Sequence, residues 1–237
     1  MNNPIKNVDI VIPIHNEEEN LKILFPKIIK IIKKIKKIKF SIVCIDDGSS
    51  DNSLKVINKF RKKNKMIKII KSKTRKGQTI CYKNYLKKYN SQYFIRLDGD
   101  NQDDPVYIKK IISFIYKNYD LVLTERKIRR HSKLMIVLAI LYDSIVEFLI
   151  RKNIKTYTSS LVCFKSKFLK RKKLIFNDHR YLPLIAMNNG AKKIKVLPIN
   201  HKKRIFGVTK YSMSKKIIFA LPEFLFFYIR LKIGFYK

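Results

Sequence analysis

Cysteine and glycine are both scarce in this chain. Its three cysteines, Cys44, Cys81 and Cys163, lack the spacing of metal-binding clusters, and two of them stand in apolar runs. We therefore expect reduced, packed thiols in a cytosolic protein. We expect no signal peptide, because the first residues lead straight into a predicted strand. Four of the six glycines fall in segments that stand out for other reasons, which indicates a backbone requirement: Gly48, Gly77, Gly99 and Gly207.

Negative charge is also in short supply. The 237 residues include 54 Lys and Arg against 17 Asp and Glu, which gives a net charge of +37. The basic residues are dispersed, and neither a basic–aromatic platform nor a helix-turn-helix pattern stands out, so we expect no nucleic-acid partner. Dispersed lysines favour an anionic membrane surface instead. Hydrophobic residues make up 46% of the chain, which is enough to bury a core and excludes a disordered polycation.

The few carboxylates are concentrated behind three apolar runs at 8–14, 40–45 and 93–97. If these runs are parallel strands, the clusters share one edge of one sheet, where open α/β folds bind ligands. Side chains two apart on an extended segment share a face, so Asp98 and Asp100 suit a divalent cation. Ten of the 17 acidic residues belong to the three clusters: Glu17, Glu18, Glu19, Asp46, Asp47, Asp51, Asp98, Asp100, Asp103 and Asp104.

Strands and helices alternate through the first half of the chain. This alternation predicts a parallel, doubly wound α/β sheet. Asp51 or Ser50 is expected to cap the second helix, and Pro105 to occupy the first turn of the fourth. The pattern predicts strands at 8–14, 40–45, 67–71, 93–97 and 120–124, and helices at 18–37, 51–63, 77–89 and 105–117.

The second half carries two apolar helical segments and one further strand, expected near 193–199. Residues 133–150 form a short, largely apolar segment that carries Asp143 and Glu147, which favours a buried or interfacial helix over a membrane span. Residues 217–232 are apolar and aromatic with basic flanks. An in-plane membrane helix and a helix docked on the sheet fit this segment equally well.

Six motifs follow one another in this sequence. They are Ile-Pro-Ile-His-Asn-Glu-Glu-Glu-Asn at 12–20, Ile-Asp-Asp-Gly-Ser-Ser-Asp at 45–51, Lys-Gly-Gln-Thr at 76–79, Leu-Asp-Gly-Asp-Asn-Gln-Asp-Asp-Pro at 97–105, His-Arg-Tyr-Leu-Pro at 179–183 and His-Lys-Lys-Arg-Ile-Phe-Gly-Val-Thr-Lys-Tyr-Ser at 201–212. In order and spacing they resemble family 2 glycosyltransferases of the GT-A fold, specifically the dolichyl-phosphate mannose synthase-like branch. The resemblance implies a Rossmann-like, mostly parallel sheet flanked by helices, with amphipathic or interfacial C-terminal helices.

The resemblance also implies a nucleotide-sugar donor, linked to GDP or UDP, at the acidic clusters. Asp98, Asp100 and Gln102 would hold Mg²⁺ or Mn²⁺ against the donor diphosphate, and oxygen-only ligands fit such a hard cation. Asp47, or its neighbour Asp46, would contact the base and ribose. The other residues expected at the donor site are Pro13, Asn16, Glu17, Lys76, Gly77, Gly99, Arg204 and Lys210.

Some residues near these motifs have a structural explanation as well. Lys76 and Gly77 are equally compatible with a plain helix start. Asp103 and Asp104 are expected to begin the following helix, where carboxylates favour the positive end of the helix dipole.

Basic residues in the second half are the candidates for contacts with phosphate and acceptor. By resemblance Arg126 stands near the acceptor or a phosphate, with Arg129 and Arg130 as alternatives. His179 and Arg180 match a segment placed near the acceptor, and a helix-cap role is the rival explanation for the histidine. Four residues resemble the family's loop that closes over the diphosphate and the acceptor phosphate: Arg204, Gly207, Lys210 and Tyr211.

The acceptor decides whether the implied inverting transfer needs a base. A polyprenyl phosphate, with a second pKa of about 6, is already a nucleophile at neutral pH. A sugar hydroxyl needs a carboxylate base, for which Asp178 is the best candidate and Glu125 the second. The family usually has an Asp where this chain has Thr156, which leaves the acceptor open.

Three functions are therefore compared. A lipid-phosphate acceptor is favoured because isolated carboxylates are few in the second half. The alternative is a family 2 enzyme that extends a surface saccharide with Asp178 as base. A non-catalytic basic module that binds membranes or nucleic acid leaves the acidic clusters unexplained.

These inferences define an expected organisation. A glycosyltransferase domain at 1–212 would contain a nucleotide-sugar half at 1–125 and an acceptor half at 126–212. The apolar segment 213–237 would associate with a membrane or dock on the domain. Such a protein would be cytoplasmic and peripheral on the inner face of the cytoplasmic membrane.

Overall fold

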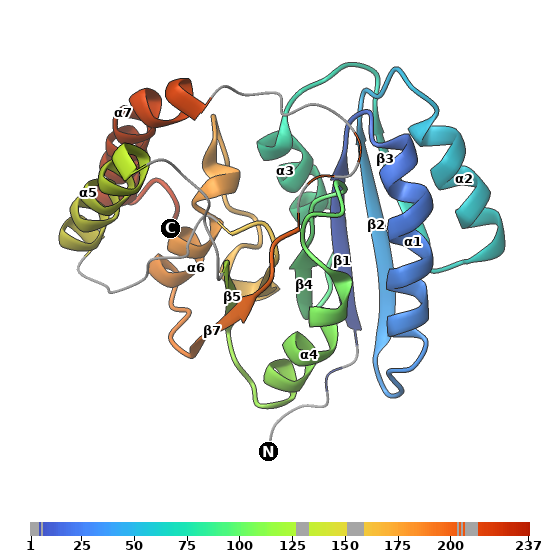
Figure 1. Ribbon diagram of the computed structural model, residues 1–237. Helices are drawn as coiled ribbons and strands as arrows, with labels where there is room; N and C mark the ends of the chain where they lie inside the picture. Colours follow the sequence, from blue (N-terminus) through green and yellow to red (C-terminus); the bar gives the residue numbers. More distant parts are fainter. Residues whose placement is uncertain are drawn as a thin grey trace.

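A mixed β-sheet forms the centre of the molecule (Figure 1). The computed structural model describes residues 5, 7–126, 133–150, 159–202, 204, 206 and 213–237. In these parts of the chain the sheet has seven strands in the order β3-β2-β1-β4-β6-β5-β7. The strands are β1 (Asn7–Ile14), β2 (Lys39–Asp47), β3 (Ile67–Ser72), β4 (Tyr93–Arg96), β5 (Leu121–Arg126), β6 (Val162–Lys165) and β7 (Ile194–Ile199).

Helices cover both faces of this sheet, so each face has its own hydrophobic core. One core lies under α1, α2 and α4, and the other lies under α3, α6 and α7. Val8, Ile10 and Ile12 of β1 face the first core and Val11 faces the second, as the period of two along a strand requires. The helices are α1 (Glu18–Ile32), α2 (Ser53–Lys63), α3 (Gln78–Lys88), α4 (Ile108–Tyr116), α5 (Lys133–Ile150), α6 (Leu182–Asn188) and α7 (Met213–Lys232).

Helix α1 illustrates how the sequence sets this packing. Leu21, Leu24, Phe25 and Ile28 follow the three- and four-residue spacing of a helix face, and all four are buried against the sheet. The predicted extension of this helix to residue 37 is wrong, because the helix ends at Ile32.

The sheet is mostly parallel, as expected, and a single described strand departs from the common direction. β6 lies between β4 and β5 and runs antiparallel to both, with Tyr93 opposite Lys165 and Leu121 opposite Phe164. With only four residues, this strand is too short for its pattern to reveal either its presence or its direction.

Two predicted helix starts also differ in detail. The fourth helix opens with a 3₁₀ turn, η1 (Pro105–Tyr107), before α4. Helix α2 starts at Ser53, and Asp51 stands two residues before it, where its carboxylate accepts hydrogen bonds from the Ser53 N–H at 2.9 Å and the Glu18 N–H at 3.1 Å. Asp51 therefore fastens α1 to α2 rather than serving as the N-cap itself.

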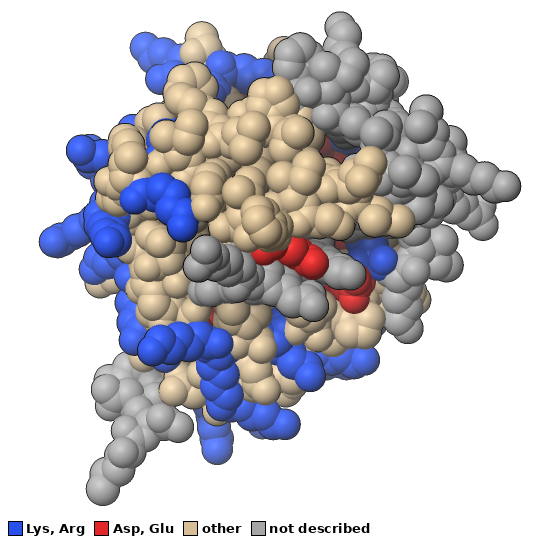
Figure 2. Space-filling view, turned by 90° about the vertical axis from the view of Figure 1, so that its left-hand side faces the viewer, with Lys and Arg blue, Asp and Glu red and all other residues tan. Residues whose placement is uncertain are grey.

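Helix α7 docks on the second core and also leaves an apolar face exposed. Phe224 and Phe227 are fully buried. None of the described helices combines the length and apolar character that crossing a bilayer requires. On the side of the molecule where α5 and α7 lie, the residues that are not drawn in grey form a broad area free of Lys and Arg over most of its extent, with a few Asp and Glu atoms exposed near its middle and basic residues mainly at its margins (Figure 2). Among the side chains that the structure describes, the large apolar ones exposed on the two helices and the turn after α7 are Ile140, Leu141, Ile145, Phe148, Leu225, Phe226, Ile229 and Ile233.

Candidate functional site

A cavity of about 610 Å³ opens at the edge of the sheet where β1, β2 and β4 end. These strands are adjacent and parallel, so the three acidic clusters share one edge, as the sequence predicted. Ten of the expected site residues line the cavity: Pro13, Glu17, Asp47, Gly77, Asp98, Gly99, Asp100, Gln102, Arg126 and Arg204.

The loop at residues 98–104, here called the acidic loop, presents two carboxylates to the cavity. The Oδ1 atom of Asp98 is buried and has no hydrogen-bond partner among the described residues. Burial raises the pKa of Asp98 to about 6, against the opposing charge of Arg96 and with a contribution from Asp100. Asp100 accepts a hydrogen bond from the Gln102 N–H at 3.1 Å, which curls the loop. A bound cation would satisfy the Asp98 oxygen and relieve the repulsion between the carboxylates.

These side chains fit a hard divalent cation that is shared with a substrate. Asp98 and Asp100 offer carboxylate oxygens, and Gln102 offers an amide oxygen. In the described part of the chain, no three His, Cys, Asp or Glu side chains are arranged to hold a metal by themselves. A cation here would complete its coordination with water and substrate oxygens, as Mg²⁺ commonly does.

Asp103 ties the acidic loop to the second half of the chain. Its carboxylate pairs with His201 Nδ1 at 2.8 Å, accepts a hydrogen bond from Ser160 and lies 3.9 Å from Arg126 Nη2. Burial raises the pKa of Asp103, but His201 and Arg126 more than offset this and hold it below its ordinary value. The expectation that both aspartates begin the next helix is therefore wrong for Asp103. Asp104 alone caps η1.

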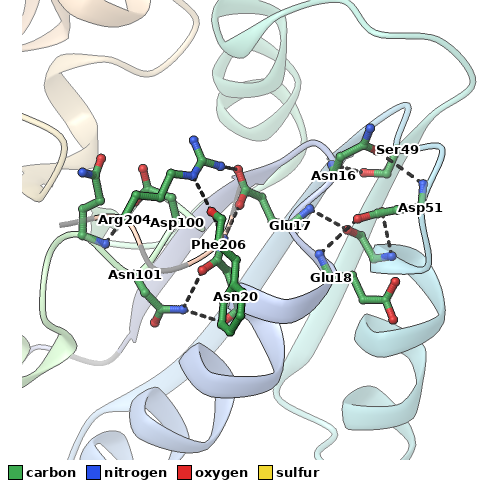
Figure 3. Close-up of polar contacts among 12 residues, drawn as sticks. Asn16, Glu17, Glu18, Asn20, Ser49, Asp51, Asp100, Asn101, Arg204 and Phe206 are labelled. Atoms are coloured by element: carbon green, nitrogen blue, oxygen red, sulfur yellow. Dashed lines mark hydrogen bonds and ion pairs between the residues drawn. The ribbon is translucent and has the colours of Figure 1, made fainter. Parts of the chain in front are cut away.

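Two predicted donor residues follow β1, and only one of them faces the cavity. Glu17 lines it at the N-terminus of α1. Asn16 lies outside the lining, with its side chain accepting the Ser50 N–H at 2.8 Å and its own N–H donating to Ser49 Oγ at 3.1 Å. Asn16 therefore joins the loops after β1 and β2 (Figure 3).

The two aspartates at the end of β2 are both buried but serve different neighbours. Asp46 accepts the Ser49 N–H at 3.2 Å and lies outside the cavity lining. Asp47 lines the cavity, and its two oxygens accept the backbone N–H groups of Lys76 and Gly77 at 2.7 and 2.8 Å. Of this pair, only Asp47 is placed to meet a ligand.

The loop after β3 reaches the cavity through a different cation from the one predicted. The Lys76 side chain is exposed and lies outside the lining, whereas Arg75, which the sequence did not single out, lines the cavity. Gly48 sets how closely this loop approaches. It has φ +67°, and a Cβ there would lie 2.6 Å from the carbonyl carbon of Thr74. Only glycine fits such an approach.

Arg126, at the end of β5, lines the cavity as expected. Its Nη2 donates to Ser160 Oγ at 3.0 Å, and its buried Nε has no hydrogen-bond partner among the described residues. Several other sequence candidates lie outside the described residues: Arg129, Arg130, Thr156, Gly207, Lys210 and Tyr211.

Arg204 connects the segment after β7 to the N-terminus of α1 (Figure 3). Its Nη2 forms an ion pair with Glu17 Oε1, and its Nε donates to the Phe206 carbonyl at 2.8 Å. The same segment lies beside the acidic loop, because the Lys202 N–H donates to the Gln102 carbonyl at 2.8 Å. The predicted phosphate-binding arginine thus lies at the acidic loop, paired with a predicted donor residue.

Arg96, the last residue of β4, is a lining residue that the sequence analysis missed. It is 4% exposed, and its Nη1 donates to the His179 carbonyl at 2.6 Å. The His179 ring pairs with Thr79 Oγ1 at 2.8 Å and does not cap a helix. Burial, with Arg96 and Arg180 nearby, lowers the pKa of His179 to about 2, so this ring is neutral. An arginine inside an apolar run gives no sequence signal of a site.

Asp178 is placed differently from the sequence prediction. It is fully buried and lies outside the cavity lining. Its Oδ1 accepts hydrogen bonds from Arg230 Nη2 and Tyr236 Oη, both at 2.8 Å. This carboxylate anchors the C-terminal segment and is not positioned to act as a base. The second candidate, Glu125, is exposed and also lies outside the lining.

The remaining side of the cavity is cationic and aromatic. Arg180, Tyr181 and Asn177 line it. Glu223 of α7 contacts all three, accepting from Arg180 Nη1 at 3.1 Å, Asn177 Nδ2 at 3.0 Å and Tyr181 Oη at 3.5 Å. Tyr142 of α5 completes this wall. None of the described residues lining this side is acidic.

Comparisons with known proteins agree with this geometry. The model of the family described as glycosyl transferase family 2 matches residues 9–193. An undecaprenyl-phosphate 4-deoxy-4-formamido-L-arabinose transferase of Yersinia enterocolitica is 26% identical over 215 residues, which cover 90% of this chain and 65% of that protein. The chain thus spans about two thirds of the length of this curated relative.

Solved structures share the fold at low identity. Glucosyl-3-phosphoglycerate synthase from Mycobacterium tuberculosis, in complex with Mn²⁺ and UDP-glucose, superposes with a TM-score of 0.66 at 14% identity, covering 92% of this chain and 78% of that one. S. aureus TarS 1-349 in complex with UDP-GlcNAc gives 0.63 at 18% identity, covering 94% and 66%.

Proposed function

Because the chain belongs to glycosyl transferase family 2, we propose that it transfers a sugar from a UDP- or GDP-sugar to a polyprenyl phosphate at a membrane surface. The observation that carries the donor half of this proposal is the buried Asp98 oxygen beside Asp100 in the cavity, for which the described residues offer no hydrogen-bond partner. The M. tuberculosis neighbour was solved with Mn²⁺ and UDP-glucose.

In this proposal Asp98, Asp100 and Gln102 hold Mg²⁺ or Mn²⁺. The cation supplies electrostatic stabilisation of the leaving nucleoside diphosphate when it is bound. Arg204 adds a bidentate contact to the diphosphate, and Asp47 contacts the nucleoside. Arg126 faces the transferred group or the acceptor phosphate. We also propose that Lys210 contacts phosphate, as the sequence predicts.

The acceptor assignment rests on what lines the far side of the cavity. Arg126 and Arg180 supply cations there, and no described lining residue on this side is a carboxylate. A hydroxyl acceptor needs a base, whereas a phosphate ionised at neutral pH attacks without one. Because Asp178 is buried against Arg230, the chemistry favours phosphate over a saccharide hydroxyl.

The apolar faces of α5 and α7 support a location at the membrane. Phe148 of α5 and Ile229 of α7 are 81% and 58% exposed, so the apolar surface lies where a bilayer can cover it. The relatives are named for undecaprenyl phosphate, a lipid. We therefore place the protein at the cytoplasmic face of the cytoplasmic membrane, bound peripherally through these two helices.

Transfer from a radiolabelled nucleotide-sugar tests this function. Purified protein is mixed with vesicles that contain undecaprenyl phosphate, Mn²⁺ and UDP- or GDP-sugars in turn, and lipid-linked label is measured. We expect a lipid product that disappears with chelator. Asp100→Ala is the inactive control. Label that appears only on saccharide acceptors, or no label with any donor, would overturn the proposal.

A further inference from the structure

We propose that Glu17 forms an ion pair with Arg204 before the donor binds, and that the donor diphosphate then displaces Glu17 and binds Arg204 itself. The inference rests on the proposed donor site and changes the role of Glu17, which the sequence presented as a donor contact. Both residues line the cavity. One arginine is therefore available either to a carboxylate of the protein or to an anion that enters.

The pair belongs to a closed ring of hydrogen bonds (Figure 3). Arg204 Nη2 donates to Glu17 Oε1, and Arg204 Nε donates to the Phe206 carbonyl at 2.8 Å. The other Glu17 oxygen accepts from Asn20 Nδ2 at 2.7 Å, and Asn20 Nδ2 also faces the Phe206 carbonyl at 3.3 Å. The Glu17 and Arg204 side chains are only 12% and 18% exposed, so solvent screens the pair weakly.

This ring is attached to the proposed metal site. Asn101, which stands between Asp100 and Gln102, donates from Nδ2 to the Asn20 carbonyl at 2.7 Å. The acidic loop is also held by the Lys202 N–H, which donates to the Gln102 carbonyl. The ring therefore places Arg204 beside the acidic loop before any ligand arrives, which lowers the ordering cost of a later contact.

Electrostatics makes the exchange reversible. A diphosphate bound with a divalent cation offers several oxygens in the bidentate geometry that arginine prefers, so it can replace a single carboxylate. Glu17 then remains at the N-terminus of α1, where the helix dipole tolerates an unpaired negative charge. After transfer, Glu17 competes for Arg204 and repels the product diphosphate. Glu17 thus weakens nucleotide binding and promotes product release.

Binding measurements on one conservative variant test this role. Glu17→Gln removes the charge and retains an oxygen that can accept from Asn20. Isothermal titration with UDP and with GDP, each with Mn²⁺, is expected to show about tenfold tighter binding to Glu17→Gln than to the wild type. Stopped-flow dissociation should slow correspondingly. Glu19→Gln is the matched control, because Glu19 lies on the same helix turn, pairs with Lys22 and lies outside the cavity lining.

A double-mutant cycle assigns the effect to Arg204. In an Arg204→Gln background, Glu17→Gln should change nucleotide affinity far less, because the arginine for which Glu17 and the diphosphate compete is absent. Equal or weaker binding by Glu17→Gln would overturn the inference, and so would an undiminished gain without Arg204. A wild type that binds neither nucleotide would overturn both the inference and the proposed function. Binding as expected without any lipid-linked product would overturn only the acceptor assignment.

Discussion

The two walls of the cavity are built in different ways. On the donor side, carboxylates follow strands that the sheet aligns, and backbone groups hold them, as with Asp47 and the loop after β3. On the acceptor side, the lining comes from β5, η3 (Asp178–Arg180), α5 and α7, joined by side-chain pairs such as Arg180–Glu223 and Asp178–Arg230. Sheet register therefore positions the donor wall, whereas ion pairs between side chains distant in sequence, of which Asp178–Arg230 is buried, position the acceptor wall. Substitutions should therefore damage chemistry on one wall and stability on the other.

The largest effect is expected at the donor wall. Asp98→Asn removes one charged cation ligand and should lower kcat/KM for sugar transfer about a thousandfold. Thermal unfolding should be almost unchanged, since the Asp98 Oδ1 atom has no hydrogen bond to lose within the described part of the chain. Steady-state transfer assays and calorimetric melting measure the two quantities. A large loss of stability would contradict the contrast between the walls.

The acceptor wall should respond in the opposite way. Asp178→Ala leaves Arg230 buried without its carboxylate and should reduce the free energy of unfolding by about 3–5 kcal/mol. Urea denaturation measures the loss, and UDP or GDP titration of the folded fraction should give an unchanged Kd. Asp178→Asn, which can still accept from Tyr236, should lose less stability. An altered nucleotide Kd would show that the walls are coupled.

A residue that joins the walls should give an intermediate effect. Asp103→Asn weakens contacts with His201 and Arg126 behind the acidic loop and should lower Mn²⁺ affinity about 10–100-fold. Manganese titration monitored by electron paramagnetic resonance measures this change. Asp104→Asn is the control, because Asp104 caps η1 and pairs with exposed Lys202. Equal losses in both variants would remove Asp103 from this positioning role.

The smallest expected effect is a pH dependence confined to the donor wall. A proton and a cation compete for Asp98, whose pKa of about 6 means that protonation increases as pH falls through this value. Mn²⁺ affinity should therefore decrease about fivefold between pH 6 and pH 5. The affinity for nucleotide in the presence of a chelator, measured over the same pH interval, is the reference. Constant Mn²⁺ affinity across this interval would rule out Asp98 as the titrating ligand.

The donor wall was largely predictable because its signals are local in sequence. An apolar run followed by aspartates indicates both a strand and the position of its end, and parallel pairing then brings Asp47, Asp98 and Glu17 to one edge. Within these loops, the sequence could not tell Asp46 from Asp47 or Arg75 from Lys76. Such choices depend on backbone turns rather than on residue type.

The acceptor wall was less predictable because its contacts are distant in sequence. Asp178 and Arg230 stand 52 residues apart, so nothing near Asp178 indicated that it was already paired. Strand β6 is too short to show the alternation of apolar and polar residues that predicts a strand, and its direction follows from tertiary pairing alone. Arg96 was hidden for the opposite reason, because it interrupts a strand whose apolar pattern dominates.

The position of β6 has a consequence for how the chain folds during synthesis. β1 to β4 are contiguous and parallel, so they can form a four-stranded sheet once residue 96 has left the ribosome, with one edge of β4 open until β6 is made. β5 pairs with β6 and β7, both of which are made later, so it must wait for residue 165 before it can join the growing sheet. The edge of the sheet that carries the proposed donor site therefore takes shape first, while β5 stays open to chaperones or to misfolding until its neighbours emerge.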